Sequence, residues 1–590
     1  MMRKTFLIAF FAVLAAAAWA TPALKAWRTH TQSDGTQLTL MLCGDENFHY
    51  FITTDGHAVV RDEAGYCYAS TKGQEMRSSG ILAHEPQLRT AEEKAALSML
   101  GSDDQPSIRR IAANSQAQGG QRRFGTPQTY TGSKRGLVLL VCFDDLDFTI
   151  DEPKATITDM LNTEGYTNSL GARGSVHDYF SHMSNGVFDL TFDVVVPYKA
   201  PKSCTYYGEN DSKGHDQHSR VVELLKFALE AADEEVDYRD YDWDGDGKVD
   251  QVYMLYAGQG EAGGGEAWTI WPHESQIGTY PFSYRLDGII LNTYACGEEL
   301  DYSGKLSGLG TFCHEFSHCL GLPDFYDTAT SELHGMGSFD VMCNGCYNNN
   351  GWLPAAYTAY ERNFCGWLDY KVLTDPCKVS KMLPLESGGD AYIIYNPGFS
   401  DEYYILEQRN KNVRWDRGLQ SRGLLIYHVN YLKSRWTNNT VNATGYDNQC
   451  MVVVPADNTL SIYDEDNDLY PYTSSLPIRT YNMLSDDTEP ADILYNKNTD
   501  GTKLLHIKLS NIKYTNSSKS VSFTFNDGTT EYGVDGIDNI FRGNRQTPAG
   551  IYTANGILVK TTDNPQQEQL PKGLYIVKPK DGEAYKILVK

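Results

Sequence analysis

The chain has 590 residues, which is too long for one domain of the usual size of roughly 100 to 200 residues. Apolar side chains make up 41% and charged side chains 22% of the chain, a balance that excludes wholesale disorder and a polytopic membrane protein. The 76 acidic and 51 basic side chains give a net charge of -25, the wrong sign for neutralising phosphates. We therefore expect several folded domains and no nucleic acid as a partner.

Residues 1–20 have the pattern of a secretory signal peptide. Arg3 and Lys4 precede an apolar run from Phe6 to Ala18, and Ala18-Trp19-Ala20 supplies the small residues that signal peptidase needs. A membrane anchor is the alternative, but it needs roughly 20 apolar residues without a cleavage site. No later segment is apolar enough to span a bilayer. We predict a secreted or cell-surface protein whose mature chain has no transmembrane segment.

Residues 21–124 are predicted to be a propeptide with its linker. Short alternating runs between about Leu24 and Leu97 predict a strand-rich unit. The stretch from Gly101 to Gln128 is rich in Ser, Gln, Gly and Ala and carries dibasic pairs at 109–110 and 122–123. This composition is typical of an exposed linker that is open to proteolysis. An ordinary interdomain linker is the alternative.

Residues 125–370 are predicted to form a mixed α/β domain. The continuous apolar runs Gly136–Phe143 and Val252–Tyr256 predict buried strands, and Val221–Ala232 has apolar residues at helical spacing. Residues 371–528 contain short strands such as Tyr392–Tyr395 and Leu424–Val429 between polar turns, and predict a β-sandwich. Residues 529–590 again alternate in short strands and are expected to form a last β unit.

The candidate chemistry lies in the sequence His314-Glu315-Phe316-Ser317-His318. Apolar residues recur at helical spacing from Leu309 to Leu320, and Ser307 is the expected N-cap of this helix. Residues four apart lie one turn apart on one face, so His314 and His318 can present both imidazoles to one Zn²⁺. Glu315 can reach the metal-bound water without being a ligand.

The residues after this helix predict a turn that completes the metal site. Gly321 can take a positive φ at the helix C-terminus, and Pro323 prevents the helix from resuming. The turn can bring Asp324 beneath the two histidines, so that two imidazoles and one carboxylate fill three zinc positions and water keeps the fourth. Two surface histidines on a Gly-capped helix are the alternative.

The complete pattern HExxHxxGxxD resembles the M6 metallopeptidases, the immune inhibitor A group, in which Asp replaces the third His of the metzincin pattern. Gly337–Met342 resembles the Met-turn of that group, whose methionine (here Met342) forms an apolar floor under the zinc. The resemblance also takes in Gly136–Phe143, 268–273, 407–409 and 423–429, and covers roughly residues 136 to 457. It implies an α/β zincin (metzincin-like) catalytic domain.

The resemblance implies a zinc-dependent endopeptidase acting on protein or peptide substrates. Zinc acidifies its bound water and polarises the scissile carbonyl, while Glu315 accepts the proton and passes it to the leaving amine. Tyr347 is the expected oxyanion helper by analogy with other metzincins, with His334 and His273 as alternatives. The rival hypothesis is an adhesive or glycan-binding surface protein on an inactive zincin scaffold, suggested by the β-rich C-terminal half.

A second metal site is predicted in the acidic loop at residues 242–250. Carboxylates at positions 1, 3, 5 and 9 of an EF-type loop suit Ca²⁺, with Gly at position 6 and a backbone carbonyl at position 7. Position 12 is Tyr253 in place of the bidentate Glu, so a further ligand must come from elsewhere. A solvated acidic turn is the alternative. The expected ligands are Asp242, Asp244, Asp246, Lys248 (through its carbonyl) and Asp250.

The C-terminal residues suggest an interaction with secretion machinery. The segment Leu570–Val577 and the final strand ending at Lys590 resemble the sorting tails of type IX secretion. Such a tail would direct the protein across an outer membrane after removal of the signal peptide. A plain β-sandwich appendage is the alternative.

Overall fold

A computed structural model describes residues 19–71, 75–100, 105–116, 125, 127–211, 217–277, 284–331, 333–443, 448–532, 549–553, 558–562, 573–579 and 585–589. The chain divides into two compact units, one ending at Thr374 and resuming over Lys381–Phe523, the other formed by Asp375–Ser380 and residues from Thr524 onward. Within the described ranges, no helix is long and apolar enough to cross a membrane. The predicted signal peptide lies almost wholly outside these ranges.

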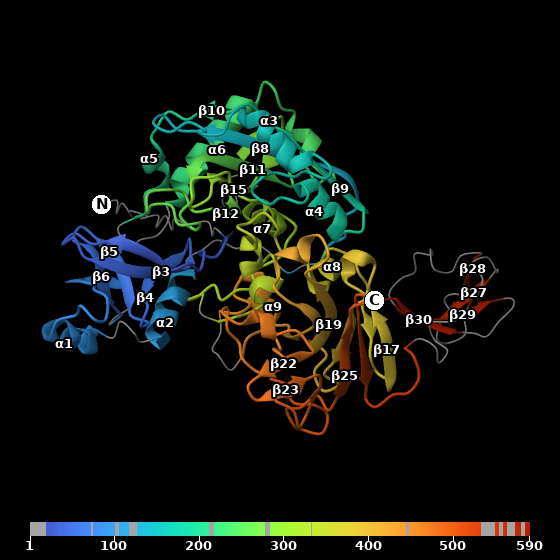
Figure 1. Ribbon diagram of the computed structural model, residues 1–590. Helices are drawn as coiled ribbons and strands as arrows, with labels where there is room; N and C mark the ends of the chain where they lie inside the picture. The colour runs from blue at the N-terminus through green and yellow to red at the C-terminus, as the bar shows by residue number, and fades with distance from the viewer. Residues whose placement is uncertain are drawn as a thin grey trace, which may run out of the picture. The chain divides into compact units, whose positions relative to one another are not determined.

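A seven-stranded mixed sheet forms the centre of the first unit (Figure 1). Its strand order is β1-β12-β15-β11-β8-β10, and β9 also pairs with β8. Strands β8 to β11 and β15 pair in parallel, whereas β12 is antiparallel to β15 and β1 is antiparallel to β12. The strands are β1 (Trp19–Ala20), β8 (Gly132–Cys142), β9 (Phe188–Val194), β10 (Tyr198–Lys199), β11 (Val252–Gln259), β12 (His273–Gln276) and β15 (Thr293–Leu300).

Helices cover both faces of this sheet because its strands are apolar on both sides. In β8, Leu137 and Leu139 pack with helix α6, while Val138 and Leu140 belong to the core that contains helix α7. This alternation follows from the two-residue period of a strand. The predicted mixed α/β domain is therefore confirmed. The helices of this domain are α3 (Pro153–Asn162), α4 (Val176–Met183), α5 (Cys204–Gly208), α6 (His218–Ala232) and α7 (Leu309–Cys319).

The predicted strand-rich N-terminal unit is a six-stranded antiparallel meander in the order β2-β3-β4-β5-β6-β7. Figure 1 shows this sheet beside the part of the central sheet that carries β12. Helices α1 (Ala91–Leu100) and α2 (Gln105–Gln116) follow it. Its strands are β2 (Arg28–Thr31), β3 (Gln37–Asp45), β4 (Phe48–Thr53), β5 (Ala58–Asp62), β6 (Gly65–Ser70) and β7 (Arg77–Leu82).

The prediction of an exposed linker from Gly101 to Gln128 is wrong where α2 forms. Ile108, Ile111 and Ala112 lie on one face of this helix and are buried against the N-terminal sheet. Spacing of three and four residues places them together, although the segment as a whole is polar. Arg109, from the first dibasic pair, lies 2.9 Å from the buried carboxylate of Asp327. The second pair lies outside the described residues.

The first unit continues into a five-stranded sheet, β16-β18-β19-β20-β21, which confirms that the C-terminal half is β-rich. Ile393, Ile405 and Leu425 of this sheet share one apolar core with α7, so both parts are held by the same buried cluster. The sandwich arrangement stays a prediction. The elements are β16 (Lys371–Val372), β18 (Tyr392–Tyr395), β19 (Glu402–Asn410), β20 (Arg422–Asn430), β21 (Met451–Val453), α8 (Ala359–Phe364) and α9 (Lys433–Thr437).

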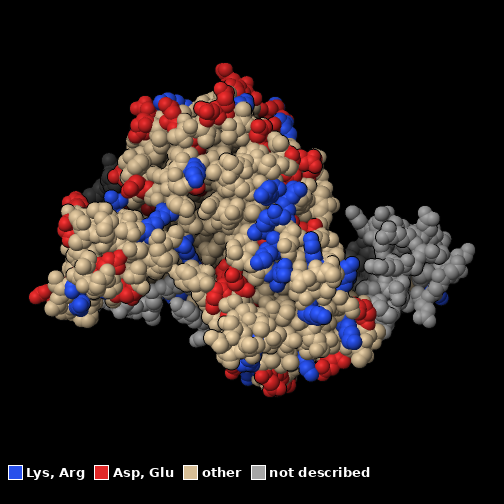
Figure 2. Space-filling model, viewed as in Figure 1, with Lys and Arg blue, Asp and Glu red and all other residues tan. Residues whose placement is uncertain are grey.

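Shorter hairpins complete the first unit, and Figure 2 shows acidic side chains gathered along its upper edge in this view. The hairpins are β13 (Tyr284–Leu286) with β14 (Ile289–Leu291) and β22 (Tyr472–Ser475) with β23 (Ile478–Tyr481). Strands β26 (Ser520–Phe525), β25 (Lys508–Thr515) and β24 (Leu484–Ser485) are neighbours, in that order, in a further sheet. The second unit has a sheet in the order β28-β27-β29-β30. The strands of this sheet are β27 (Ala549–Thr553), β28 (Leu558–Thr562), β29 (Gly573–Pro579) and β30 (Tyr585–Val589). Strand β17 (Cys377–Met382), which belongs to a different sheet, also begins in this unit.

Candidate metal centre and active site

Helix α7 carries the predicted catalytic motif through the middle of the apolar core. Phe312 stacks on Tyr253 of β11 with ring centroids 3.9 Å apart, and Phe316 is also fully buried. The prediction of Ser307 as the N-cap is wrong. Gly308 occupies the N-cap position, and glycine has no side chain that could accept a hydrogen bond there. The Ser307 hydroxyl instead donates to Glu298 Oε1 at 2.9 Å. Aromatic packing and not a cap therefore fixes this helix against the sheet.

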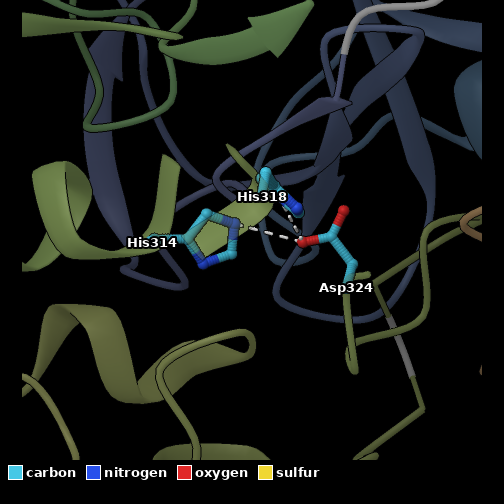
Figure 3. Close-up of side chains that lie close together, drawn as sticks. All are labelled: His314, His318 and Asp324. Carbon is cyan, nitrogen blue, oxygen red and sulfur yellow. Dashed lines mark ion pairs between the residues drawn. The ribbon is translucent and has the colours of Figure 1, made fainter. Parts of the chain in front are cut away.

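The chain turns sharply after α7 and returns Asp324 to the two histidines, as the sequence predicts. Gly321 has φ of 90°, a conformation that glycine adopts without the steric cost of a side chain. Asp324 Oδ1 lies 3.1 Å from His314 Nε2 and 3.4 Å from His318 Nε2. Figure 3 shows the carboxylate facing both imidazoles from the segment that follows the helix. All three side chains are fully buried.

Hydrogen bonds from the surrounding chain orient these three side chains. His314 Nδ1 lies 2.7 Å from the Val341 carbonyl, and His318 Nδ1 lies 2.8 Å from the Leu322 carbonyl. Nδ1 donates in both rings, which leaves each Nε2 with its lone pair for a metal ion. The Asn439 amide donates to Asp324 Oδ2, and its oxygen accepts from the Asp324 backbone N–H at 2.6 Å. Sequence reasoning missed Asn439 and Val341.

This donor set fits a zinc ion. Neither His314 Nε2 nor Asp324 Oδ1 has a hydrogen-bond partner within the described part of the chain, although both are buried, and an unsatisfied buried polar atom costs stability. Burial acts to raise the pKa of Asp324, but attraction to His318 and contacts with both imidazoles lower this pKa to about 2. Two imidazoles and an ionised carboxylate are ordinary zinc ligands, and three protein ligands leave one position open for chemistry.

Glu315 lies beside this group and is in contact with the beginning of the described chain. Its Oε1 accepts hydrogen bonds from both the backbone N–H and the hydroxyl of Thr21, each at 2.5 Å. Burial raises the pKa of Glu315 well above its ordinary value, while His318 and the hydrogen bonds from Thr21 act in the opposite direction. Its second oxygen accepts no hydrogen bond from any residue that the structure describes. This contact spans 294 positions, and no local pattern predicts it.

The segment from residue 19 to residue 24 lies across the candidate site. Strand β1 pairs with β12, and the Trp271 indole N–H donates to the Thr21 carbonyl at 2.9 Å. Glu46, on the turn between β3 and β4, brings a second N-terminal carboxylate to this region. Burial raises its pKa well above the ordinary value, and Asp45 and then Asp324 raise it further. The N-terminal unit therefore covers both the metal-ligand group and Glu315.

Of the three expected oxyanion helpers, Tyr347 lies at the covered site. Its hydroxyl donates to the Pro22 carbonyl at 2.7 Å, next to the residue that contacts Glu315. His273 lies in β12 with its ring nitrogens 2.7 Å from the Trp271 carbonyl and 2.8 Å from the Tyr294 hydroxyl. Burial lowers the pKa of His273 to about 3. His334 faces Glu465 at 3.2 Å.

Met342 is fully buried in the core that surrounds α7. Its backbone carbonyl accepts from Phe325 N–H at 2.8 Å, which ties this turn to the residue after Asp324. The preceding residue, Val341, supplies the carbonyl that orients His314. The turn at Gly337–Met342 therefore braces both the helix ligand and the loop ligand.

The acidic loop brings three of the predicted ligands together. Oxygens of Asp242, Asp244 and Asp250 lie within 4.8 Å of one another. Asp246 instead pairs with the Lys248 ammonium, and Asp242 accepts backbone N–H groups of the loop. Burial, together with the neighbouring carboxylates Asp244, Asp242 and Asp246, raises the pKa of Asp250 to about 6, although the Trp243 N–H opposes the shift.

Comparison with known proteins identifies the central part of the chain. Residues 148–368 match the family described as immune inhibitor A peptidase M6, catalytic domain. Pre-pro-metalloprotease PrtV of Vibrio cholerae serotype O1 is 28% identical over 273 residues, which cover 39% of this chain and 29% of PrtV. Immune inhibitor A of Bacillus thuringiensis subsp. alesti is 28% identical over 280 residues, 40% of each chain. The similarity thus spans less than half of either relative.

Proposed function

Because residues 148–368 form an M6 peptidase catalytic domain, we propose that the protein is a secreted zinc endopeptidase that hydrolyses peptide bonds of extracellular proteins. The observation that supports this most directly is the convergence of His314, His318 and Asp324 beside Glu315. An inactive adhesive scaffold is the rival function. Such a scaffold would have to bury unsatisfied polar atoms at no benefit, a cost of roughly 1–3 kcal/mol for each group.

The proposed mechanism assigns one role to each part of the site. When bound by His314, His318 and Asp324, zinc supplies a Lewis acid that polarises the scissile carbonyl and makes water more acidic. Glu315 takes a proton from the attacking water and delivers it to the leaving amine nitrogen. Glu315 directly follows His314 on helix α7, so it lies beside the metal ligands for both proton transfers. Asn439 keeps Asp324 in place.

Digestion of casein or gelatin by the purified protein tests this function. We expect cleavage that stops when a zinc chelator is added and returns when zinc is restored. Binding of the same proteins without cleavage, in a preparation that contains stoichiometric zinc, would favour the adhesive function. Zinc content is therefore measured on the same sample.

We also propose that the protein is made as a zymogen in which the N-terminal unit covers the site. Thr21 holds Glu315 and Tyr347 is engaged by Pro22, so substrate cannot reach either side chain while the segment is present. The N-terminal unit is anchored on both sides of the site, since Arg28 donates to the Gly263 and Gly264 carbonyls and Gly44 N–H donates to Ser331. Removal of this unit would expose the site.

Maturation is expected to remove the segment that precedes roughly Arg123. N-terminal sequencing of the active species should give a start between about Ile111 and Gly136, because β8 is buried and resists proteolysis. The ion pair between Arg109 and Asp327 disfavours cleavage at the first dibasic pair, so the second pair is the expected site. Fully active protein that still begins at Thr21 would contradict the zymogen proposal.

We propose Ca²⁺ as the ion of the acidic loop, with Asp242, Asp244 and Asp250 as ligands. The pKa of Asp250 in the folded protein exceeds its ordinary value, so the metal-free fold loses stability as pH rises from about 4 through 6. A divalent cation offsets this repulsion and stabilises the fold by mass action, on the order of 2.7 kcal/mol at a hundred times the dissociation constant. The roles of Asp246 and of the Lys248 carbonyl remain predictions.

The melting temperature of metal-stripped protein should therefore rise with added Ca²⁺, and more at pH 7 than at pH 4. Asp244→Ala should erase this response while zinc content is unchanged. Asp151→Ala removes an exposed carboxylate outside the loop and should leave the response intact. A melting curve that does not move across millimolar Ca²⁺ would leave this loop as a solvated acidic turn.

Export and sorting rest on the two ends of the chain. We propose cleavage of the signal peptide after Ala20 and recognition of the last strands by secretion machinery. The described part of the tail, β29 and β30, is an antiparallel pair, whereas residues 570–572 lie outside the described ranges. Cell fractionation of chains with and without residues 529–590 tests the sorting role, since loss of the tail should retain the protein inside the outer membrane.

A further inference from the structure

The N-terminal segment lies on the central sheet in the manner of an extended peptide. Strand β1 is antiparallel to β12, with Ala20 opposite His273 and Trp19 opposite Glu274. Apart from β1, strand β12 is the edge of its sheet, and an exposed edge offers main-chain groups to any extended chain. Strand β1 belongs to the proposed signal peptide, so a substrate could take its place along β12 once the signal peptide and the N-terminal unit are removed.

The contacts of Glu315 set the register of this segment. Glu315 accepts a hydrogen bond from the backbone nitrogen of Thr21. In peptide hydrolysis the general base delivers its proton to the amine nitrogen of the residue that follows the scissile bond. Thr21 therefore occupies the position of that residue, and Ala20 occupies the position of the residue that precedes the bond.

The next two carbonyls of the segment are each held by one side chain of the catalytic domain. Trp271 donates its indole N–H to the Thr21 carbonyl at 2.9 Å, and Tyr347 donates its hydroxyl to the Pro22 carbonyl at 2.7 Å. Both bonds go to main-chain oxygens, which every peptide presents. They therefore recognise an extended backbone whatever its side chains are.

The surroundings of Trp271 come largely from the N-terminal unit. The indole packs with Ala23 and Leu42 and stacks on the His49 ring with centroids 4.9 Å apart. Removal of the N-terminal unit would take away these neighbours and the carbonyl that Trp271 binds. A Trp side chain that loses both its packing and its acceptor is suited to bind another peptide in the same place.

We propose that Trp271 and Tyr347 bind the two main-chain carbonyls that follow the scissile bond of a substrate. The enzyme would then require extended peptides with at least two residues after that bond. Tyr347 acts in substrate binding and not as the oxyanion helper that the sequence predicts. This inference rests on the proposed function, because it assumes that the site hydrolyses peptides.

Steady-state kinetics of the matured protein test the two roles separately. Trp271→Phe and Tyr347→Phe should each raise KM roughly two- to tenfold with kcat little changed, because each variant removes one hydrogen bond to bound substrate. If Tyr347 instead stabilised the oxyanion, Tyr347→Phe would lower kcat at constant KM. That result would overturn the assignment of Tyr347 to substrate binding. Trp268→Phe, at an exposed tryptophan three residues before Trp271, is the matched control and should match wild type.

A pair of substrates tests the inference without relying on the variants. In one peptide an alkene replaces the amide between the first and second residues after the scissile bond, and an ester peptide controls for loss of the N–H. Wild-type enzyme should bind the alkene peptide more weakly than the amide peptide, whereas Trp271→Phe should bind both peptides equally well, because it lacks the donor for this carbonyl. Equal losses in both enzymes would overturn the role of Trp271.

Direct binding gives a readout that needs no turnover. The peptide Thr-Pro-Ala-Leu, with a free amino group, reproduces residues 21 to 24 and should quench the tryptophan fluorescence of matured protein. Its affinity should fall two- to tenfold in Trp271→Phe and stay unchanged in Trp268→Phe. If wild type binds this peptide but cleaves no substrate, the proposed function fails and the binding role stands. If it cleaves substrates and the variants behave as wild type, only this inference fails.

Discussion

Glu315→Gln is expected to lower proteolytic activity by roughly 10²- to 10⁴-fold while the protein still binds one zinc ion. The change is isosteric and leaves His314, His318 and Asp324 untouched, so the metal-ligand group keeps its geometry. Among the described residues, it removes the one carboxylate that lies beside this group and also contacts the Thr21 nitrogen. A general base at this place has no substitute among the described side chains in contact with Thr21.

Peptide hydrolysis and metal analysis on the same sample check this result. Glu402→Gln makes the same chemical change at a buried carboxylate in β19, where Glu402 accepts from His428 at 2.9 Å. This control should retain activity even if its melting temperature falls. Activity near that of wild type in Glu315→Gln, with zinc bound, would mean that another group acts as the base.

The sequence is sufficient to predict the metal-ligand group because the three ligands lie close to one another along the chain. A spacing of four residues places His314 and His318 on one helix face, and Gly321 with Pro323 marks the turn that returns Asp324. The alternating faces of β8 follow in the same way from a continuous apolar run. Periodicity therefore predicts the buried strands of the central sheet, and helical spacing together with the turn at Gly321 predicts the three metal ligands.

The parts that could not be predicted depend on contacts between distant residues. Asn439 orients Asp324 from 115 positions away, and Thr21 contacts Glu315 across 294 positions. Strand β12 has the polar sequence His-Glu-Ser-Gln, so no apolar alternation marks it in the sequence. Helix α2 is a different case, since its three apolar residues at helical spacing were present but outweighed by a polar composition.

The metal-ligand group itself makes the second large prediction. Asp324→Ala should lower zinc affinity by more than 100-fold and abolish activity, because two imidazoles alone form an incomplete site. The substitution removes the oxygen that lies 3.1 Å and 3.4 Å from the two Nε2 atoms. Competition with a chelator of known zinc affinity measures this change.

Asn439→Ala separates the ligand from the residue that orients it. Asn439 makes two hydrogen bonds to Asp324 but does not contact the histidines through any hydrogen bond found among the described residues. Loss of an outer partner of this kind typically costs 10- to 100-fold in metal affinity, so this variant should be intermediate between wild type and Asp324→Ala. Asn438→Ala, at the exposed neighbouring residue, should bind zinc as wild type does.

Stoichiometric zinc with unchanged affinity in Asp324→Ala would show that the third ligand is another residue. An unchanged affinity in Asn439→Ala alone would show that the loop after Gly321 holds Asp324 in place without help from the C-terminal half.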